Sequence, residues 1–161
     1  MIHTVDLESI DQRERITKHD VKARIEEFNS LAGYEHIHKG MTSRDLTENV
    51  EQCQILSSLQ LIRDRLVATL TLMGQRALEY SDLAVAGRSH NVPAQITTVG
   101  KRFANSAEEI LFGFDALEGL IDRLPLRGIK GPVGTQQDML DLFQGDTTKL
   151  VTLDQKVAEE L

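Results

Sequence analysis

A long stretch from Thr42 to about Ser81 constrains the fold more than any other part of the sequence. It contains no proline and a single interior glycine, Gly74. Apolar residues recur along it at steps of three and four, the spacing of one helix face. The repeating positions are Leu46, Val50, Cys53, Leu56, Leu59, Ile62, Leu66, Leu70, Met73 and Ala77. With a rise of 1.5 Å per residue, the predicted helix is about 50–55 Å long.

The apolar surface of this helix is wider than one stripe. Ile55, Leu61, Val67 and Leu72 fall outside the repeating positions. A helix that is apolar on more than one face packs against several partners. A compact monomer of 161 residues has little room for so long a helix. We therefore expect it to pack between subunits.

A second long helix is predicted from about Pro93 to Arg123, before Pro125. Its apolar stripe consists of Val99, Phe103, Ala107, Ile110, Phe114, Leu117 and Ile121. Shorter helices are predicted at residues 6–16, at Val21–Ser30 with Asp20 as N-cap, at Asp138–Phe143, and from Thr147 onward, capped by Thr147 or Asp146. The predicted fold class is all-α, dominated by two long antiparallel helices, with at most a short strand pair near residues 126–133.

Composition excludes several classes of protein. The net charge is −7, which does not favour binding to nucleic acid or to an anionic membrane. There is no apolar run long enough to span a bilayer, and no signal segment follows Met1. Cys53 is the only cysteine, so no internal disulfide can form. We expect a cytoplasmic protein. Because Leu161 falls inside a helical pattern, we also expect the chain to be part of a longer one.

A polar stretch from Gly87 to Gln95 separates the two long helices. Pro93 suits the first turn of the second helix, since its missing N–H costs nothing there. His90 is then placed in the connector or first turn, where an imidazole can act as an acid or base near neutral pH. A surface capping role is the alternative for this lone histidine.

Two further segments place polar groups at predicted helix N-termini, where free N–H groups favour anions. Lys18 and His19 precede the helix that begins near Val21, and a solvated charged turn is the alternative reading. Thr42 and Ser43 begin the long helix, where they are also good capping residues.

Two other patterns are less specific. His36 and His38 are two residues apart, but no further ligands stand at a familiar metal-site spacing, so no metal site is predicted. Gly128, Gly131 and Gly134 indicate a close backbone approach, or simply a glycine-rich turn or strand pair. The absence of a following Gly-Lys-Ser/Thr excludes a phosphate-binding P-loop.

Four segments taken together resemble adenylosuccinate lyases of the fumarase/aspartase superfamily. They are Lys18–Asp20, Thr42–Asn49, Gly87–Ala104 and Gly128–Gln136. The resemblance implies a homotetramer whose active sites each draw on three subunits. It implies β-elimination of fumarate from adenylosuccinate to give AMP, and from the related succinocarboxamide ribotide of purine biosynthesis. No metal or organic cofactor is implied.

The resemblance also assigns roles to residues. His90 is the expected acid, and His19 the second expected catalytic residue. The expected substrate-binding residues are Lys18, His19, Asp20, Thr42, Ser43, Ser89 and Gln136. The superfamily's signature loop, S-S-x-M-P-x-K-x-N, carries the serine held to be the general base and is absent from this sequence. We therefore expect the isolated chain to be inactive.

In this reading residues 1–42 end an N-terminal helical domain, and residues 43–161 begin the central helical bundle. The alternatives are a non-catalytic helical oligomerisation module or another lyase of the same superfamily.

Overall fold

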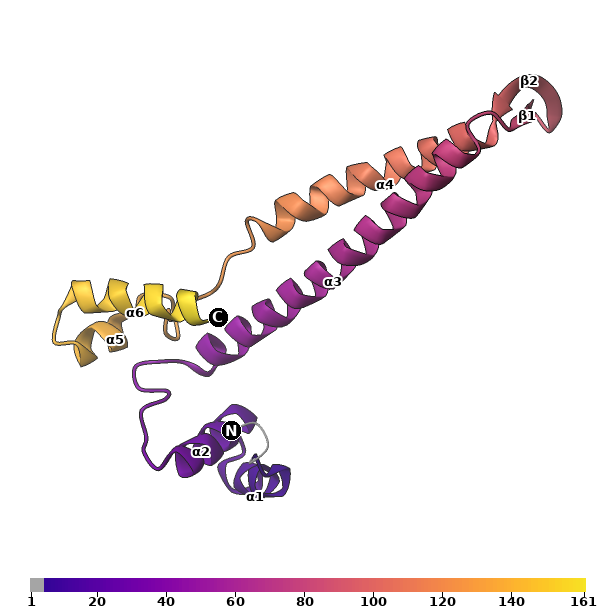
Figure 1. Cartoon of the computed structure of the whole chain (residues 1–161). Coiled ribbons are helices and arrows are strands. Elements are labelled where there is room, and N and C mark those ends of the chain that lie inside the picture. The colour runs from indigo at the N-terminus through magenta and orange to yellow at the C-terminus, as the bar shows by residue number, and fades with distance from the viewer. Residues whose placement is uncertain (1–4) are drawn as a thin grey trace. The chain divides into compact units, whose positions relative to one another are not determined.

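The computed structural model describes residues 5–161, and its helices and one strand pair confirm the predicted all-α class (Figure 1). The elements are α1 (Leu7–Thr17), α2 (Asp20–Ala32), α3 (Ser43–Glu79), β1 (Ala84–Ser89), β2 (Val92–Thr98), α4 (Val99–Ile121), α5 (Gln137–Leu142) and α6 (Thr147–Glu160). Within residues 5–161, none of the helices combines the length and apolar character needed to cross a membrane. The chain divides into two compact units, and α3 contributes to both.

Unit 1 comprises the described residues up to Cys53 together with Pro125–Leu161. Its first part is the α1–α2 pair, whose core consists of Ile10, Val21, Ala23 and Ile25. The buried carboxylate of Glu27 crosses this pair, because it accepts hydrogen bonds from Ser9 Oγ at 2.6 Å and Arg13 Nε at 3.1 Å. Its second part is the loop from residue 125 to residue 136 with α5 and α6, in which Ile129 and Met139 are buried.

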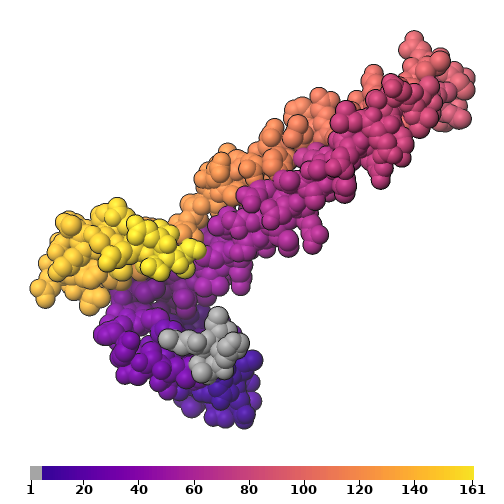
Figure 2. Space-filling view, viewed as in Figure 1, coloured from indigo at the N-terminus to yellow at the C-terminus, as the bar shows by residue number. Residues whose placement is uncertain are grey.

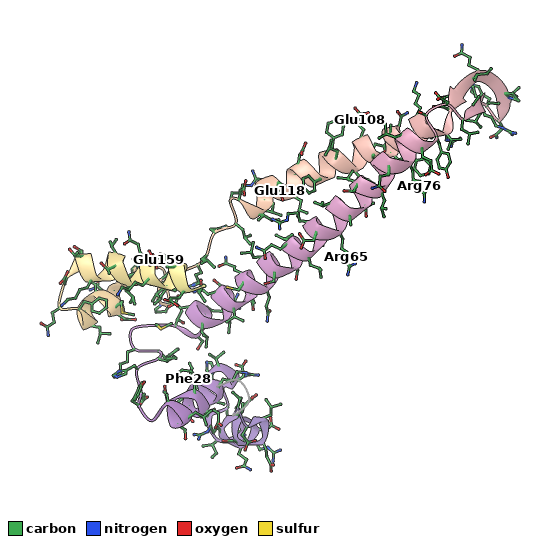
Figure 3. All side chains as sticks on the ribbon, in the orientation of Figure 1. Phe28, Arg65, Arg76, Glu108, Glu118 and Glu159 are labelled. Carbon is green, nitrogen blue, oxygen red and sulfur yellow. The ribbon has the colours of Figure 1, made fainter. Side chains whose placement is uncertain are left out.

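Unit 2, Gln54–Leu124, is a helical hairpin made of the later part of α3 and the whole of α4. The two helices lie side by side in the ribbon and space-filling views (Figures 1 and 2). Half-buried residues from both predicted stripes, such as Leu66 and Phe103, form the seam between them. Charged side chains such as Arg65 and Glu108 lie on the exposed outer surface (Figure 3).

The start of α4 lies close to the end of α3 at Gly100, the second residue of α4. Its N–H donates to Tyr80 O at 2.9 Å. A Cβ built on Gly100 would lie 2.3 Å from Ala77 O and 2.7 Å from Ser81 N. The rings of Tyr80 and Phe103 stack beside this contact, with centroids 6.2 Å apart.

Much apolar surface of unit 2 stays exposed in the single chain. Ile55, Leu61, Val67 and Leu72, which the sequence places outside the main stripe, are between 48% and 59% exposed. On α4, Phe112 is 71% exposed. The wide apolar surface is therefore present, and its packing against other subunits stays a prediction.

The strand pair is not where the sequence placed it. It is formed by β1 and β2, which pair antiparallel around His90 and Asn91, instead of by residues 126–133. The two turn residues have φ values of 50° and 63°, which is the backbone of the two-residue turn that suits hairpin twist. Residues 127–131 instead direct their backbone groups to side chains of α3 and α6.

Two predicted helix starts are also wrong. Pro93 is not in a first turn: it pairs with Arg88 in β2, and α4 begins at Val99 with Thr98 as its cap. A two-stranded sheet consists only of edges, where proline is tolerated. Asp20 is not the N-cap of α2; that residue is His19, whose ring accepts from Lys22 N.

Candidate active site

His19 and Ser43 lie in contact in unit 1. His19 Nδ1 accepts from Lys22 N–H at 3.3 Å, and its Nε2 lies 3.3 Å from Ser43 Oγ. Because Nδ1 is an acceptor, a neutral ring carries its proton on Nε2 and donates it to the serine hydroxyl. The N-terminus of α2 and the N-terminus of α3 thereby meet within one chain.

A cavity of about 250 Å³ opens beside this contact. Its lining combines basic, acidic, neutral polar and apolar side chains: His19, Lys22, Ile25, Glu26, Asn29, Glu35, Ile37, His38, Lys39 and Ser43. His38 Nε2 and Asn29 Oδ1 are buried and, within residues 5–161, have no hydrogen-bond partner. Buried polar atoms are nearly always paired, so these two atoms are candidate contacts for a ligand.

Lys18 and Asp20 flank His19 but point to other partners. Lys18 ends α1 in the left-handed conformation, with φ 54°, and borders a separate open hollow with Asp11, Glu14 and Arg15. Asp20 pairs with Arg24 at 3.4 Å and lies 3.6 Å from His19 Nδ1. Of the three motif residues, His19 alone lines the cavity.

The start of α3 is fixed by Asp45, a residue of the Thr42–Asn49 segment. Asp45 Oδ2 accepts from Thr42 N–H at 3.0 Å, while Asp45 N–H donates to Thr42 O at 3.0 Å. This reciprocal pair is a capping arrangement. It occupies the Thr42 N–H and leaves the Thr42 hydroxyl, with Ser43, as the groups that can face a substrate.

Asp45 is also the most deeply buried charged group, at 1% exposure. Burial alone would raise the pKa of its carboxyl. Hydrogen bonds from Thr42, Lys130, Arg127 and Gly131 outweigh burial, so its pKa is lowered. The hydrogen bond between Arg127 and Asp45 also raises the pKa of the Arg127 guanidinium. Asp45 is therefore an ionised carboxylate.

Gln136 precedes α5 with φ 55°. Its side-chain Nε2 donates to Ile129 O at 2.7 Å, and its N–H donates to Lys130 O at 3.0 Å. It lines a second cavity, of about 280 Å³, against α6. The amide nitrogen is thus occupied by the loop, and the side-chain oxygen is the atom left to meet a ligand.

Ser89 and His90 belong to unit 2. Ser89 ends β1 opposite Val92, and His90 is the first residue of the hairpin turn. Both residues are exposed. Unit 1 therefore contains His19, Thr42, Ser43 and Gln136, with Gln136 facing a different cavity from His19 and Ser43, and the hairpin of unit 2 carries the expected acid.

His36, one of the two histidines considered for a metal site, contacts Lys39 and Tyr34. His36 Nδ1 lies 3.4 Å from Lys39 Nζ, and its ring is 5.4 Å from that of Tyr34. Across residues 5–161, no group of three or more His, Cys, Asp or Glu side chains is placed to hold a metal ion.

Solved structures share this fold. A fumarate lyase from Mesorhizobium sp. BNC1 superposes with a TM-score of 0.74 at 23% identity, over 83% of this chain and 32% of that one. A 3-carboxy-cis,cis-muconate lactonizing enzyme from Pseudomonas putida gives 0.73 at 19% identity, over 95% of this chain and 36% of that one. At such identities the likeness defines the fold alone.

The sequence narrows the class further. A profile of the family described as lyase matches residues 2–139, so the chain belongs to this lyase family. Among curated relatives, adenylosuccinate lyase of Saccharomyces cerevisiae is 37% identical over 92% of this chain. That of Archaeoglobus fulgidus is 31% identical over 83% of this chain. The chain spans 31% and 30% of the lengths of these relatives.

Proposed function

We propose that this chain forms part of an adenylosuccinate lyase, a C–N lyase that eliminates fumarate from adenylosuccinate to give AMP. The same chemistry would act on the related succinocarboxamide ribotide of purine biosynthesis. The observation that carries the proposal is the His19–Ser43 contact beside a cavity lined by Lys22, His38 and Lys39. Lys22 and Lys39 can bind an anionic group of a substrate beside Glu26 and Glu35 of the same lining, and His19 and Ser43 belong to the motifs that resemble this family.

The residues divide the work of a β-elimination, in which a base removes a proton beside a carboxylate and an acid protonates the departing nitrogen. The hydroxyls of Thr42 and Ser43 bind a substrate carboxylate and stabilise the negative charge that develops on it. Lys18, His19 and Asp20 bind or orient the substrate, and Gln136 contacts it through its side-chain oxygen. His90 donates the proton to nitrogen, and Ser89 orients His90. The base comes from outside this chain.

Shared active sites in a homotetramer follow from the same proposal. His90 is on a different compact unit from the His19–Ser43 pair, and unit 2 has a wide exposed apolar surface that other subunits would cover. Burial of such a surface is the main driving force of obligate association. In this proposal the partners are a nucleotide substrate and further copies of the chain. Nucleic acid, a membrane and a cofactor are not part of it, and the proposed location is the cytoplasm.

The exposed apolar surface also favours a second candidate, a non-catalytic helical oligomerisation module. An assay separates the two. A full-length protein containing this chain should consume adenylosuccinate, followed by ultraviolet absorbance, and His90→Ala should lower kcat by about 10²–10⁴-fold. Lys156→Ala, at an exposed position of α6 outside the proposed roles, is the control and should leave turnover unchanged. Absence of turnover by a correctly assembled full-length protein would favour the module.

A further inference from the structure

The Asp45 carboxylate joins two segments that the proposed function places around one substrate. Its Oδ1 accepts from Arg127 Nε at 2.9 Å and from Lys130 N–H at 3.0 Å. Its Oδ2 accepts from Thr42 N–H at 3.0 Å and from Gly131 N–H at 2.9 Å. One buried side chain thereby fixes the backbone beside Ser43 and the backbone of the glycine-rich loop.

The same face of α3 holds the loop at further points. Asn49, one turn after Asp45, donates from Nδ2 to Gly128 O at 2.9 Å and accepts from Gly128 N–H at 3.0 Å. Gln52 Oε1 accepts from Arg127 N–H at 2.6 Å. Side chains at steps of three and four share a helix face. Asp45, Asn49 and Gln52 therefore form one polar face that hydrogen-bonds to the backbone of the loop.

On its other side the loop is held by α6. Asp154 Oδ1 accepts from Ile129 N–H at 3.1 Å, and its Oδ2 accepts from Lys130 Nζ at 2.6 Å. A Cβ on Gly128 would lie 2.3 Å from Asp154 Oδ1, and Gly128 has φ 65°, so a side chain here would displace the Asp154 carboxylate and strain the backbone. Gln136 is bonded in turn to Ile129 O and Lys130 O. Hydrogen bonds therefore connect Thr42 N–H to Asp45, Asp45 to the backbone of Lys130 and Gly131, and Lys130 O to Gln136 N–H.

We propose that Asp45 is a positioning residue, which sets where Gln136 stands relative to the Thr42–Ser43 pair when substrate binds. Asp45 itself is too deeply buried to touch the substrate. The inference rests on the proposed function, because it assigns the Gln136 side chain and the two hydroxyls to one substrate. A carboxylate is required at this position, since all four of its partners are donors.

The test is a double-variant cycle on substrate binding in the full-length protein. His90→Ala serves as the background, so that adenylosuccinate is bound but not consumed, and its Kd is measured by titration calorimetry. Asp45→Asn keeps the shape but turns an NH₂ group toward N–H donors. We expect Asp45→Asn and Gln136→Ala each to weaken binding by about tenfold, the loss of one good hydrogen bond. We expect the combined variant to bind no more weakly than Gln136→Ala.

A merely structural role gives a different pattern. It would lower the melting temperature while leaving the Kd of the folded sites unchanged, or it would add its full effect to that of Gln136→Ala. Either result overturns the inference. Glu51→Gln, an exposed carboxylate on the same helix, is the matched control and should not change Kd. If Asp45→Asn does not fold, Arg127→Gln removes one donor to Asp45 and should show the same non-additivity with a smaller effect.

The outcomes also separate the two proposals. If the background protein does not bind adenylosuccinate, or if Gln136→Ala has no effect on binding, the substrate assignment fails and the inference fails with it. If Gln136→Ala weakens binding and Asp45→Asn does not, the proposed function stands and the positioning role of Asp45 is wrong.

Discussion

Asn49 on α3 and Gly128 in the glycine-rich loop exchange two hydrogen bonds, Nδ2 to O at 2.9 Å and N–H to Oδ1 at 3.0 Å. Their positions in the sequence are 79 residues apart. Both residues are buried. The amide side chain of Asn49 thus pairs with a peptide group in the way that a neighbouring strand would, which explains why residues 126–133 form no strand pair of their own.

This pairing predicts a large effect of Asn49→Leu on stability. The variant leaves the Gly128 N–H and C=O buried without their partner, and each unsatisfied group costs about 1–3 kcal/mol. We expect the free energy of unfolding, measured with urea, to fall by about 2–4 kcal/mol. Gln60→Leu, at an exposed position of α3, is the control and should change it by less than about 0.5 kcal/mol. Equal effects of the two variants would contradict the pairing.

Asp45 predicts how stability depends on pH. Its pKa is lowered in the folded chain, whereas in the unfolded chain it is about 3.9. The unfolded state therefore binds more protons in acid. The contribution of Asp45 is present above about pH 4 and is lost as pH falls through the lowered folded value. Urea denaturation between pH 3 and pH 7 should show a shallower acid loss for Asp45→Asn than for the unchanged protein. If the free energy of unfolding of both proteins falls in parallel with pH, ionisation of Asp45 does not stabilise the folded chain.

Gly100 gives a prediction with controls inside its own helix. An alanine Cβ at this position would meet Ala77 O at 2.3 Å and Tyr80 C at 2.7 Å. Gly100→Ala should therefore force α3 and α4 apart and destabilise the hairpin by about 1–3 kcal/mol. Gly113 and Gly119, also in α4, have no atom within 4 Å of such a Cβ. Gly113→Ala and Gly119→Ala should stabilise the chain by up to about 1 kcal/mol through helix propensity. Thermal unfolding of the three variants decides, and a neutral Gly100→Ala would contradict the close approach.

Local patterns predicted most of the helices. The three-and-four spacing located α3 with its start near Ser43, the predicted helix at residues 6–16 matches α1 within a residue at each end, and capping residues placed the start of α6. The start of α4 could not be predicted this way, because Pro93 is acceptable both in a first helical turn and on a strand edge. The choice is made by the His90–Asn91 turn, which has positive φ values but lacks the glycine that marks a two-residue hairpin turn in a sequence.

The site was predictable only in part. Residues at helix starts, such as His19 and Ser43, can be found from capping chemistry and family motifs. The role of Asp45 could not be, because three of its four donors come from residues 127–131 and depend on tertiary structure. One signal was available: Asp45, Asn49 and Gln52 recur at steps of four and three and therefore share one helix face. His38 likewise stood next to the Thr42 motif, and its buried Nε2 distinguishes it from a surface histidine.

We propose that His90 of one subunit and the His19–Ser43 pair of another subunit complete one active site. The most direct measurement is complementation between two inactive full-length variants, His90→Ala and His19→Ala, mixed under conditions that exchange subunits, with mixed tetramers verified by native mass spectrometry. If each site takes the two residues from different subunits, mixing should restore about a quarter of the unmodified activity, because half of each contribution is intact. Mixed tetramers that stay as inactive as the separate variants would show that both histidines come from one chain, and would contradict the shared site.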